Sequence, residues 1–209
     1  MYSRFFWDNL YRCHIADVPW MKESWQGDVL SAIDPFIPSE AKSLLDYGCG
    51  NGFMGHYYYQ KGLSVDLADI SDYLVNKLKI KYGDTNIHII RTDTPDELFE
   101  KTGRKYDVVL AWSLFHHINP IDWNVFLYGF SRLLNTKGVL VVGGWDISDV
   151  IIKRDGGKAR YTGKETWTLN ALINYVEDNY RVLHNDVLEV LAPSFAIKRI
   201  IRFYILEKK

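Results

Sequence analysis

Short apolar runs alternate regularly with amphipathic segments from residue 43 to residue 143. The apolar runs predict strands and the amphipathic segments predict helices. Strands that alternate with helices need crossover connections, and right-handed crossovers place the strands parallel with helices on both faces. The sequence therefore predicts an α/β fold with a doubly wound sheet. The expected strands are 43–47, 63–68, 86–91, 106–112 and 138–143, and the expected helices are 52–61, 71–82 with Ser71 as its N-cap, 96–101 and 122–134.

The last third of the chain departs from this alternation. After an expected helix over 166–178, two strand-like stretches follow at 181–191 and 197–207, joined by the short segment "APSF". So short a connection cannot carry a parallel crossover. We therefore expect the two strands to pair antiparallel at one edge of the sheet.

Composition indicates one domain with an extension. A chain of 209 residues with 47% apolar content can bury one good core but is short for two independent domains. Its 25 basic and 26 acidic residues nearly cancel, which disfavours nucleic acid as the main partner. No apolar run approaches the roughly 20 residues of a membrane-crossing helix, so a cytoplasmic protein is expected. With only Cys13 and Cys49, neither a disulfide framework nor a metal site is implied.

The turn after the first expected strand, "LLDYGCGNGFMG", is rich in glycine. In open α/β sheets ligands bind beyond the carboxyl ends of the strands, and glycine lets the backbone approach them closely. Gly50, Gly52 and Gly55 fit the dinucleotide pattern G-x-G-x-x-G, and Asp69 lies at the spacing of a ribose-binding acid. A nicotinamide-dependent dehydrogenase is therefore one interpretation.

Three features favour a different cofactor. Asp46 stands two residues before Gly48, where a carboxylate suits a ligand with an ammonium group better than one with a pyrophosphate. The stretch "YDVVLAWSLFHHI" leads from a buried strand into an aromatic and histidine-bearing loop on the ligand side of the sheet. The antiparallel C-terminal pair is also more than a simple dinucleotide fold needs.

Five segments in order resemble the motifs of the class I S-adenosylmethionine-dependent methyltransferases of the small-molecule type. They are "LLDYGCGNG", "SVDLADIS", "IIRTDTPDE", "YDVVLAWSLFHHI" and "KGVLVVGGWD". The resemblance covers 44–144 by motif and the C-terminus by topology. It implies a seven-stranded, mostly parallel sheet with an antiparallel C-terminal strand, and S-adenosyl-L-methionine as the cofactor.

The same resemblance implies the cofactor residues. Asp69 would bind both ribose hydroxyls; Asp66 competes for this role but sits inside the strand. Asp93 would lie near the adenine amino group, and Gly55 becomes a position where helix and sheet pack closely. The full expected set is Asp46, Gly48, Gly50, Asn51, Gly52, Asp69, Ile70, Asp93, Thr94 and Trp112.

A sulfonium methyl group is already activated, so such an enzyme mainly holds the acceptor in line with it, and positioning can supply about 7 to 11 kcal/mol. Where the acceptor loses a proton, a base helps. His116, His117 and Asp146 are the candidates, since each is expected at the carboxyl end of a strand. His117 has a structural alternative, packing against the following helix. Asp107, at the opposite end of its strand, is expected to be a structural partner.

We expect residues 1–40 to form an aromatic-rich helical cover and residues 41–209 to form the methyltransferase domain. The ordinary explanation of such an apolar stripe is packing on the sheet. The resemblance adds contacts with the acceptor from Tyr11 and Trp20, and Trp145 is expected to join them. An aromatic wall would also attract a cationic sulfonium.

The basic stretch "IIKRDGGKARYTGKET" is expected to be a mobile, solvated loop. Its alternative is a lid whose Arg154 and Arg160 bind a carboxylate or phosphate on the acceptor. The expected function is methylation of a small molecule. The alternatives are an RNA or protein methyltransferase, a cofactor-binding homologue without catalysis and, ranked last, the dehydrogenase. The acceptor and the oligomeric state are left open.

Overall fold

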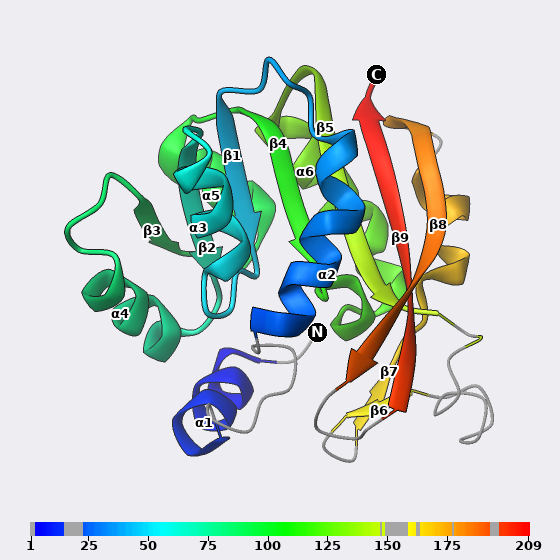
Figure 1. Cartoon of the computed structure of the whole chain (residues 1–209), viewed down its shortest axis with the longest axis horizontal. Coiled ribbons are helices and arrows are strands. Elements are labelled where there is room, and N and C mark those ends of the chain that lie inside the picture. Colours follow the sequence, from blue (N-terminus) through cyan, green and yellow to red (C-terminus); the bar gives the residue numbers. More distant parts are fainter. Residues whose placement is uncertain are drawn as a thin grey trace.

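A seven-stranded sheet forms the centre of the structure, a computed structural model that describes residues 3–14, 23–146, 148, 159–161, 164–176, 178–192 and 197–209. The strands of this sheet are β1 (Ser43–Tyr47), β2 (Ser64–Asp69), β3 (His88–Arg91), β4 (Tyr106–Trp112), β5 (Leu134–Trp145), β8 (Tyr180–Ala192) and β9 (Ile197–Lys208). Their order is β3-β2-β1-β4-β5-β9-β8 (Figure 1). The first five are parallel, and β9 runs antiparallel to β5 and β8. The predicted sheet and its antiparallel C-terminal pair are thus confirmed.

Helices lie on both faces of this sheet (Figure 1). The helices are α1 (Arg4–His14), α2 (Glu23–Ile33), α3 (Phe53–Gln60), α4 (Asp72–Lys81), α5 (Pro95–Thr102), α6 (Trp123–Leu133) and α8 (Ile173–Val176), with 3-10 turns η3 (Asp34–Phe36), η4 (Phe115–His117), η5 (Pro120–Asp122) and η6 (Leu169–Leu172). None of the helices that the structure describes has the length and apolar character needed to cross a membrane.

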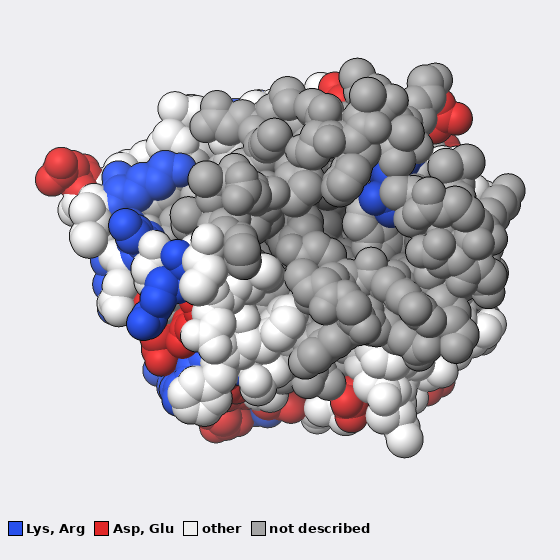
Figure 2. Space-filling model, turned by 90° about the horizontal axis from the view of Figure 1, so that it is seen from below, with Lys and Arg blue, Asp and Glu red and all other residues white. Residues whose placement is uncertain are grey.

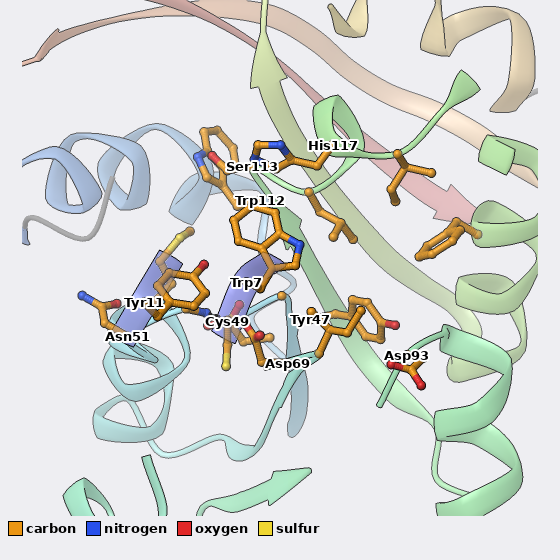
Figure 3. A pocket seen from close by; sticks show the side chains of 18 of the residues that line it. Trp7, Tyr11, Tyr47, Cys49, Asn51, Asp69, Asp93, Trp112, Ser113 and His117 are labelled. Atoms are coloured by element: carbon orange, nitrogen blue, oxygen red, sulfur yellow. Dashed lines mark hydrogen bonds between the residues drawn. The ribbon is translucent and has the colours of Figure 1, made fainter. Parts of the chain in front are cut away.

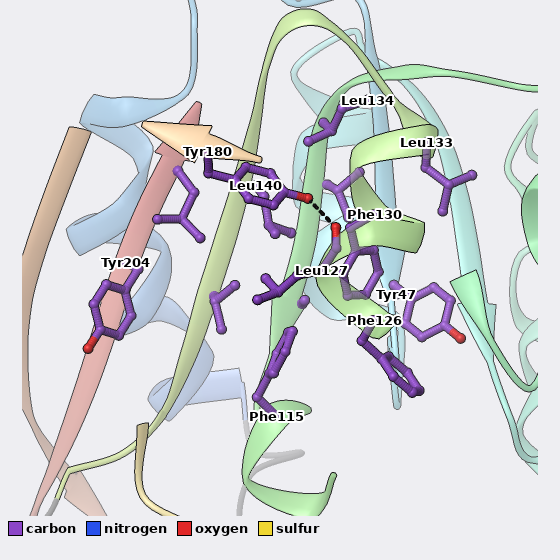
Figure 4. Packing of buried hydrophobic residues seen from close by; sticks show 14 of the residues in the cluster. Tyr47, Phe115, Phe126, Leu127, Phe130, Leu133, Leu134, Leu140, Tyr180 and Tyr204 are labelled. Carbon is purple, nitrogen blue, oxygen red and sulfur yellow. Dashed lines mark hydrogen bonds between the residues drawn. The ribbon is translucent and has the colours of Figure 1, made fainter. Parts of the chain in front are cut away.

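Two hydrophobic cores hold the helices to the sheet. On one face Val29 of α2, Tyr58 of α3 and Leu78 of α4 pack against the strands. On the other face α6 is the main partner, and Figure 4 shows Phe130 and Leu127 packed against the strands there. The Tyr180 hydroxyl donates to the Leu127 carbonyl at 2.7 Å, so this buried phenol is satisfied. The sheet is therefore buried on both faces, as its near-continuous apolar strands require.

A side-chain hydroxyl caps the N-terminus of each of the helices α4 and α5. The Ser71 hydroxyl accepts the amide N–H of Leu74 and caps α4, as predicted. The Thr94 hydroxyl accepts the amide N–H of Glu97 and caps α5, with Pro95 at the first helical position. Both caps follow the carboxyl end of a strand, so they fix the turns that border the ligand side of the sheet.

The expected structural role of Asp107 is confirmed. Its carboxylate accepts the backbone N–H groups of Lys42 and Ser43 at 2.9 and 3.0 Å, and the Asn135 amide donates to it at 2.7 Å. Burial alone would raise the pKa of Asp107, but these hydrogen bonds outweigh it and lower that pKa. Asp107 therefore joins the start of β1 to β5.

Two expectations for the segment after β5 are met only in part. The helix expected over 166–178 is shorter than predicted: residue 166 ends β7 (Lys164–Thr166), and the helical residues are those of η6, which runs directly into α8. Part of the basic stretch expected to be a loop is a hairpin in which β6 (Ala159–Tyr161) pairs antiparallel with β7. Leu169, at the start of the helical residues, is fully buried, and its carbonyl accepts the Tyr204 hydroxyl of β9 at 3.0 Å.

Gly55 packs α3 against β2, as the sequence predicts. A Cβ atom there would lie 2.3 Å from Leu67 Cδ2 and 3.2 Å from Asp46 Cβ. We expect Gly55→Ala to lower the free energy of unfolding by about 1 to 3 kcal/mol, because overpacking forces neighbours to shift. Gly27 of α2 is the matched control, since a Cβ atom there meets nothing within 4 Å. Gly27→Ala should stabilise by about 0.5 to 1 kcal/mol in the same urea titration; equal effects would contradict the packing role.

Candidate functional site

A cavity opens at the carboxyl ends of β1, β2 and β4, and α1 borders it (Figure 3). It comprises about 920 Å³ of space between atoms, part of it open to solvent. The polar side chains of its lining are Gln26, Asp46, Asn51, Asp69, Asp93, Ser113 and His117. The remainder of the lining is Trp7, Tyr11, Tyr47, Gly48, Cys49, Gly50, Met54, Ile70, Trp112, Leu114, Ile118 and Phe126.

The glycine turn forms one wall of this cavity. Gly48, Gly50 and Gly52 have φ angles of +72°, +54° and +71°, a backbone region that favours glycine. Gly48 and Gly50 line the cavity, so the backbone is exposed to a ligand without a side chain between them. Gly52 lies outside the lining, and a Cβ atom there would come within 2.9 Å of Leu67 and Tyr82. The structure thus places Gly52 in packing, where it begins α3.

Asp46 is a buried carboxylate in the floor of the cavity. Its Oδ2 accepts the amide N–H of Gly55 at 2.9 Å. Burial, helped by the nearby charge of Asp69 and opposed by the hydrogen bond from Gly55, raises the pKa of Asp46 to about 7. A buried acid with no cation beside it in the described part of the chain is an attractive partner for a ligand ammonium group.

Asp69 ends β2 and points its carboxylate toward the glycine turn (Figure 3). Its two oxygens accept the amide N–H groups of Gly50 at 3.1 Å and Ser71 at 2.9 Å. Burial raises the pKa of Asp69 to about 6, and the backbone hydrogen bonds oppose that shift. Asp69 therefore joins the glycine turn to the start of α4 at the cavity wall.

Asp66, the competing acid in the same strand, does not line the cavity. Its carboxylate accepts the Arg104 guanidinium at 2.8 Å and the Tyr106 hydroxyl at 2.6 Å. His88 Nδ1 lies 3.1 Å from it. These contacts occupy the carboxylate fully, so Asp66 serves the structure of the sheet.

Amide and carboxylate groups complete the polar wall. Asn51 and Gln26 exchange side-chain hydrogen bonds at 3.2 and 3.3 Å, which ties α2 to the glycine turn. Asp93 lines the cavity beyond β3 and forms an ion pair with Arg91. Thr94, expected beside it at the cofactor, lies outside the lining, where it caps α5. Ile70 lines the cavity as expected.

The end of β4 presents a strained residue to the cavity. Ser113 has a φ angle of +56°, although it is not glycine, and its amide N–H donates to the Gly143 carbonyl at 2.8 Å. Such a backbone costs about 1 kcal/mol or more and is typical of functional sites. Trp112 also lines the cavity, and a Cβ atom on Gly143 would lie 2.4 Å from its indole ring. Gly143 thus makes the room that Trp112 occupies.

The two histidines take different positions. His117 lines the cavity, and its ring meets the Trp7 ring edge to face at 4.8 Å between centroids. Burial lowers the pKa of His117 to about 3, so its imidazole is neutral at physiological pH. His116 lies behind it, 4.0 Å between ring centroids, outside the lining, and burial lowers its pKa well below the usual value. The structure therefore brings one of the two to the cavity.

Trp145 ends β5 and Asp146 follows it, and both lie outside the cavity lining. Burial alone would raise the pKa of Asp146, but hydrogen bonds from Ser148 and the Arg202 guanidinium at 2.6 Å outweigh it and lower that pKa. A carboxylate held in this way is a poor proton acceptor, so the base role expected of Asp146 lacks support here. The Trp145 ring instead packs under the Arg199 guanidinium, 3.9 Å away.

The remaining expected acceptor residues fall partly outside the described residues. Tyr11 lines the cavity from α1, whereas Trp20 and Arg154 lie in segments that the structure does not describe. Arg160 lies in β6, where its backbone pairs opposite Glu165. Trp7 also lines the cavity but is not among the predicted site residues. Its position four residues before Tyr11 places both side chains on one face of a helix.

Comparison with known proteins gives a family and a fold. A family model described as "Methyltransferase domain" matches residues 20–186 of this chain. The ubiquinone biosynthesis O-methyltransferase of Pelagibacter ubique is 31% identical over 114 residues, which cover 50% of this chain and 42% of that relative. The match thus spans less than half the length of this curated relative.

Solved structures share the whole arrangement of strands and helices. An S-adenosylmethionine-dependent methyltransferase from Anabaena variabilis has a TM-score of 0.76 at 14% identity and covers 100% of this chain and 96% of its own. The 1,6-didemethyltoxoflavin-N1-methyltransferase of Burkholderia thailandensis, solved with 1,6-didemethyltoxoflavin and S-adenosylhomocysteine, has a TM-score of 0.72 at 18% identity, covering 99% and 87%. At these identities the similarity shows the fold.

Proposed function

The chain belongs to the methyltransferase-domain family, and from this premise we propose that it transfers a methyl group from S-adenosyl-L-methionine to a small-molecule acceptor. The observation that carries the proposal is the gathering of Asp46, Asp69 and Asp93 around one cavity whose glycine turn presents bare backbone. Three carboxylates suit a ligand with an ammonium group, a ribose and an adenine amino group, and they repel a pyrophosphate. The dehydrogenase alternative is disfavoured for that reason.

The residues present fit this cofactor. Asp46 would accept the ammonium group, Asp69 the ribose hydroxyls and Asp93 the adenine amino group, while Gly48 and Gly50 leave room for the methionine part. When bound, the cofactor supplies an activated methyl group. The chain's task is then to orient the acceptor and exclude water, and positioning of this kind supplies about 7 to 11 kcal/mol.

Aromatic residues and a histidine in the lining of the cavity are proposed to hold the acceptor. Trp7, Tyr11 and Trp112 provide flat apolar surfaces, which favour a flat, weakly polar acceptor. His117 is proposed to position an acceptor hydroxyl or amine by a hydrogen bond to its imidazole, because it lines the cavity and is neutral. Its lowered pKa makes it a weak proton acceptor, so positioning is the role that the site supports best. We also propose that residues 1–40 act as a cover and 41–209 as the catalytic domain, since α1 borders the cavity.

A macromolecular acceptor is a second candidate that the charges disfavour. Figure 2 shows the face at the strand ends, where Lys and Arg side chains gather on one side with Asp and Glu among them. Arg4 pairs with Asp72, and Arg12 lies over the Tyr73 ring. The 25 basic and 26 acidic residues of the whole chain nearly cancel, which disfavours a phosphate backbone as the partner. We therefore favour a small-molecule acceptor, and we propose a cytoplasmic location, which fractionation of producing cells tests.

Turnover tests the proposal. Purified chain is incubated with S-adenosyl-L-methionine and a panel of phenols, enols, amines and thiols, and release of S-adenosylhomocysteine is measured. We expect release with at least one flat acceptor, and a loss of up to about 100-fold for His117→Ala, because the acceptor loses a group that positions it. Binding of S-adenosylhomocysteine without release across the panel would favour the homologue that lacks catalysis.

Binding of S-adenosylhomocysteine should depend on pH. In the free chain the pKa of Asp46 is about 7 and that of Asp69 about 6, and both acids must ionise to accept the ligand's donors. Affinity is then full only above about pH 8 and falls by about tenfold per pH unit for each acid below its pKa. Calorimetry between pH 8 and pH 5 checks this, and an affinity constant over that range would contradict the carboxylate contacts.

The stability of the free chain should depend on pH in the opposite direction, falling where the affinity for the ligand rises. Both carboxyls have a pKa above the usual value of 3.8 for aspartate, so the folded state holds their protons more tightly than the unfolded state. Their burial therefore costs progressively more stability as the pH rises from about 4 to about 7. Asp46→Asn should remove part of that loss.

A further inference from the structure

Asp8 joins α1 to the first turn of α4. Its Oδ1 accepts the Ser71 hydroxyl at 2.6 Å and the amide N–H of Tyr73 at 3.1 Å. A carboxylate at the N-terminus of a helix is favoured by the helix dipole, and charged acceptors form stronger hydrogen bonds than neutral ones. Asp8 therefore provides a specific polar link between these helices.

Ser71 stands between two carboxylates. It is fully buried, its hydroxyl donates to Asp8, and its amide N–H donates to Asp69 Oδ1 at 2.9 Å. The other oxygen of Asp69 accepts the amide N–H of Gly50 at the glycine turn. One buried serine thus contacts the acid on α1 and the acid that lines the cavity, and the negative charge of Asp8 is felt at Asp69, where it helps to raise the pKa.

The same helix brings aromatic side chains to the cavity. Trp7 and Tyr11 are buried, and their rings stack at 5.7 Å between centroids. Trp7 also meets His117, while Phe5 on the opposite face is 68% exposed. Asp8 lies between these two aromatic residues in the sequence, so the way in which it holds α1 decides where both rings lie.

We propose that Asp8 is a positioning residue that latches α1 over the cavity, and that Ser71 couples this latch to the ribose-binding site at Asp69. The identity of the cofactor rests on the proposed function, whereas the latch rests on the hydrogen bonds alone. Coupling of this kind is reciprocal: a bound cofactor favours the latched helix, and the latched helix favours the bound cofactor. Loss of Asp8 therefore affects both.

Hydrogen exchange of the α1 amides, read by mass spectrometry, tests the latch. We expect Asp8→Ala to speed exchange in α1 of the free chain by about 10- to 100-fold, and to weaken S-adenosylhomocysteine binding by about 5- to 20-fold. The matched control is Arg4→Ala, which removes the exposed ion pair with Asp72 at 3.4 Å between the same helices. It should change either quantity by less than about threefold, because exposed pairs contribute little.

The coupling has its own readout. In the wild-type chain S-adenosylhomocysteine should slow exchange in both α1 and the segment around Asp69; in Asp8→Ala it should slow exchange around Asp69 alone. Unchanged exchange of α1 in free Asp8→Ala would overturn the latch, and equal protection of α1 in both chains would overturn the coupling. If Asp8→Ala does not fold, Asp8→Asn is used in the same experiments. Its α1 exchange rate and its affinity for S-adenosylhomocysteine should lie between those of the wild type and those expected for Asp8→Ala. If the wild-type chain fails to bind the ligand, the proposed function fails, while exchange in the free chain still decides on the latch.

Discussion

Replacing Asp69 by alanine is expected to weaken S-adenosylhomocysteine binding by about 100-fold or more. The carboxylate is buried at the end of β2 and is the proposed acceptor of two ribose hydroxyls. Hydrogen bonds to a charged group contribute about 1.5 to 3 kcal/mol each, and about 1.4 kcal/mol corresponds to tenfold in affinity. Its removal also frees the amide N–H groups of Gly50 and Ser71. Calorimetry at about pH 8, where both cavity acids are ionised, measures the loss.

Asp66 provides the control from the same strand. It is as buried as Asp69, but Arg104 and Tyr106 hold it away from the cavity. Asp66→Asn should lower the free energy of unfolding by about 1 to 3 kcal/mol and leave the dissociation constant within about twofold. Similar losses of affinity in both variants would show that Asp69 acts through the structure rather than at the ribose.

Replacing Trp123 by alanine should lower the free energy of unfolding by about 3 to 5 kcal/mol. The side chain is fully buried, and its Nε1–H donates to the carbonyls of Phe115 at 3.2 Å and Ile118 at 3.0 Å. Both carbonyls belong to the turn that carries His117, so the tryptophan holds this turn from beneath. Thermal or urea unfolding measures the loss of stability.

Two further variants separate packing from hydrogen bonding. Trp123→Phe keeps an aromatic ring but leaves both carbonyls without that donor, which should cost about 1 to 3 kcal/mol and reduce turnover more than cofactor binding. Tyr128→Ala, on the same helix but 55% exposed, should change stability by less than about 0.5 kcal/mol. A Trp123→Ala chain as stable as Tyr128→Ala would contradict the supporting role.

Local sequence was sufficient for the sheet. Apolar runs such as Tyr106–Trp112 are buried strands whose bounds follow from their own composition, and the short link after β8 permits only antiparallel pairing. The segment after β5 was not predictable in this way. Its residues 166–178 have a helical pattern, but only 169–176 are helical, and the first turn, where Leu169 and Leu172 are buried against the sheet, is a 3-10 turn. Contacts made between distant segments override local preference there.

Some residues of the candidate site are likewise predictable from local sequence, and others are not. Asp46, Asp69 and the glycines belong to one strand–helix–strand unit, β1-α3-β2, so their sequence spacing predicts their meeting at the cavity. Gln26 and Trp7 reach the cavity from helices that precede β1, and no local pattern gives the docking of those helices. Asp146 shows the reverse error. Its position at the end of β5 is as expected, but Arg202 of β9 takes its carboxylate.

Calorimetric titration of the purified chain with S-adenosylhomocysteine and, separately, with NAD tests the central claim most directly. The carboxylates that line the cavity favour a ligand with an ammonium group and disfavour a pyrophosphate. We expect S-adenosylhomocysteine to bind with a dissociation constant on the order of micromolar, a free energy near −8 kcal/mol, and NAD not to bind. Binding of NAD without binding of S-adenosylhomocysteine would contradict the assignment of the cavity and, with it, the proposed methyl transfer.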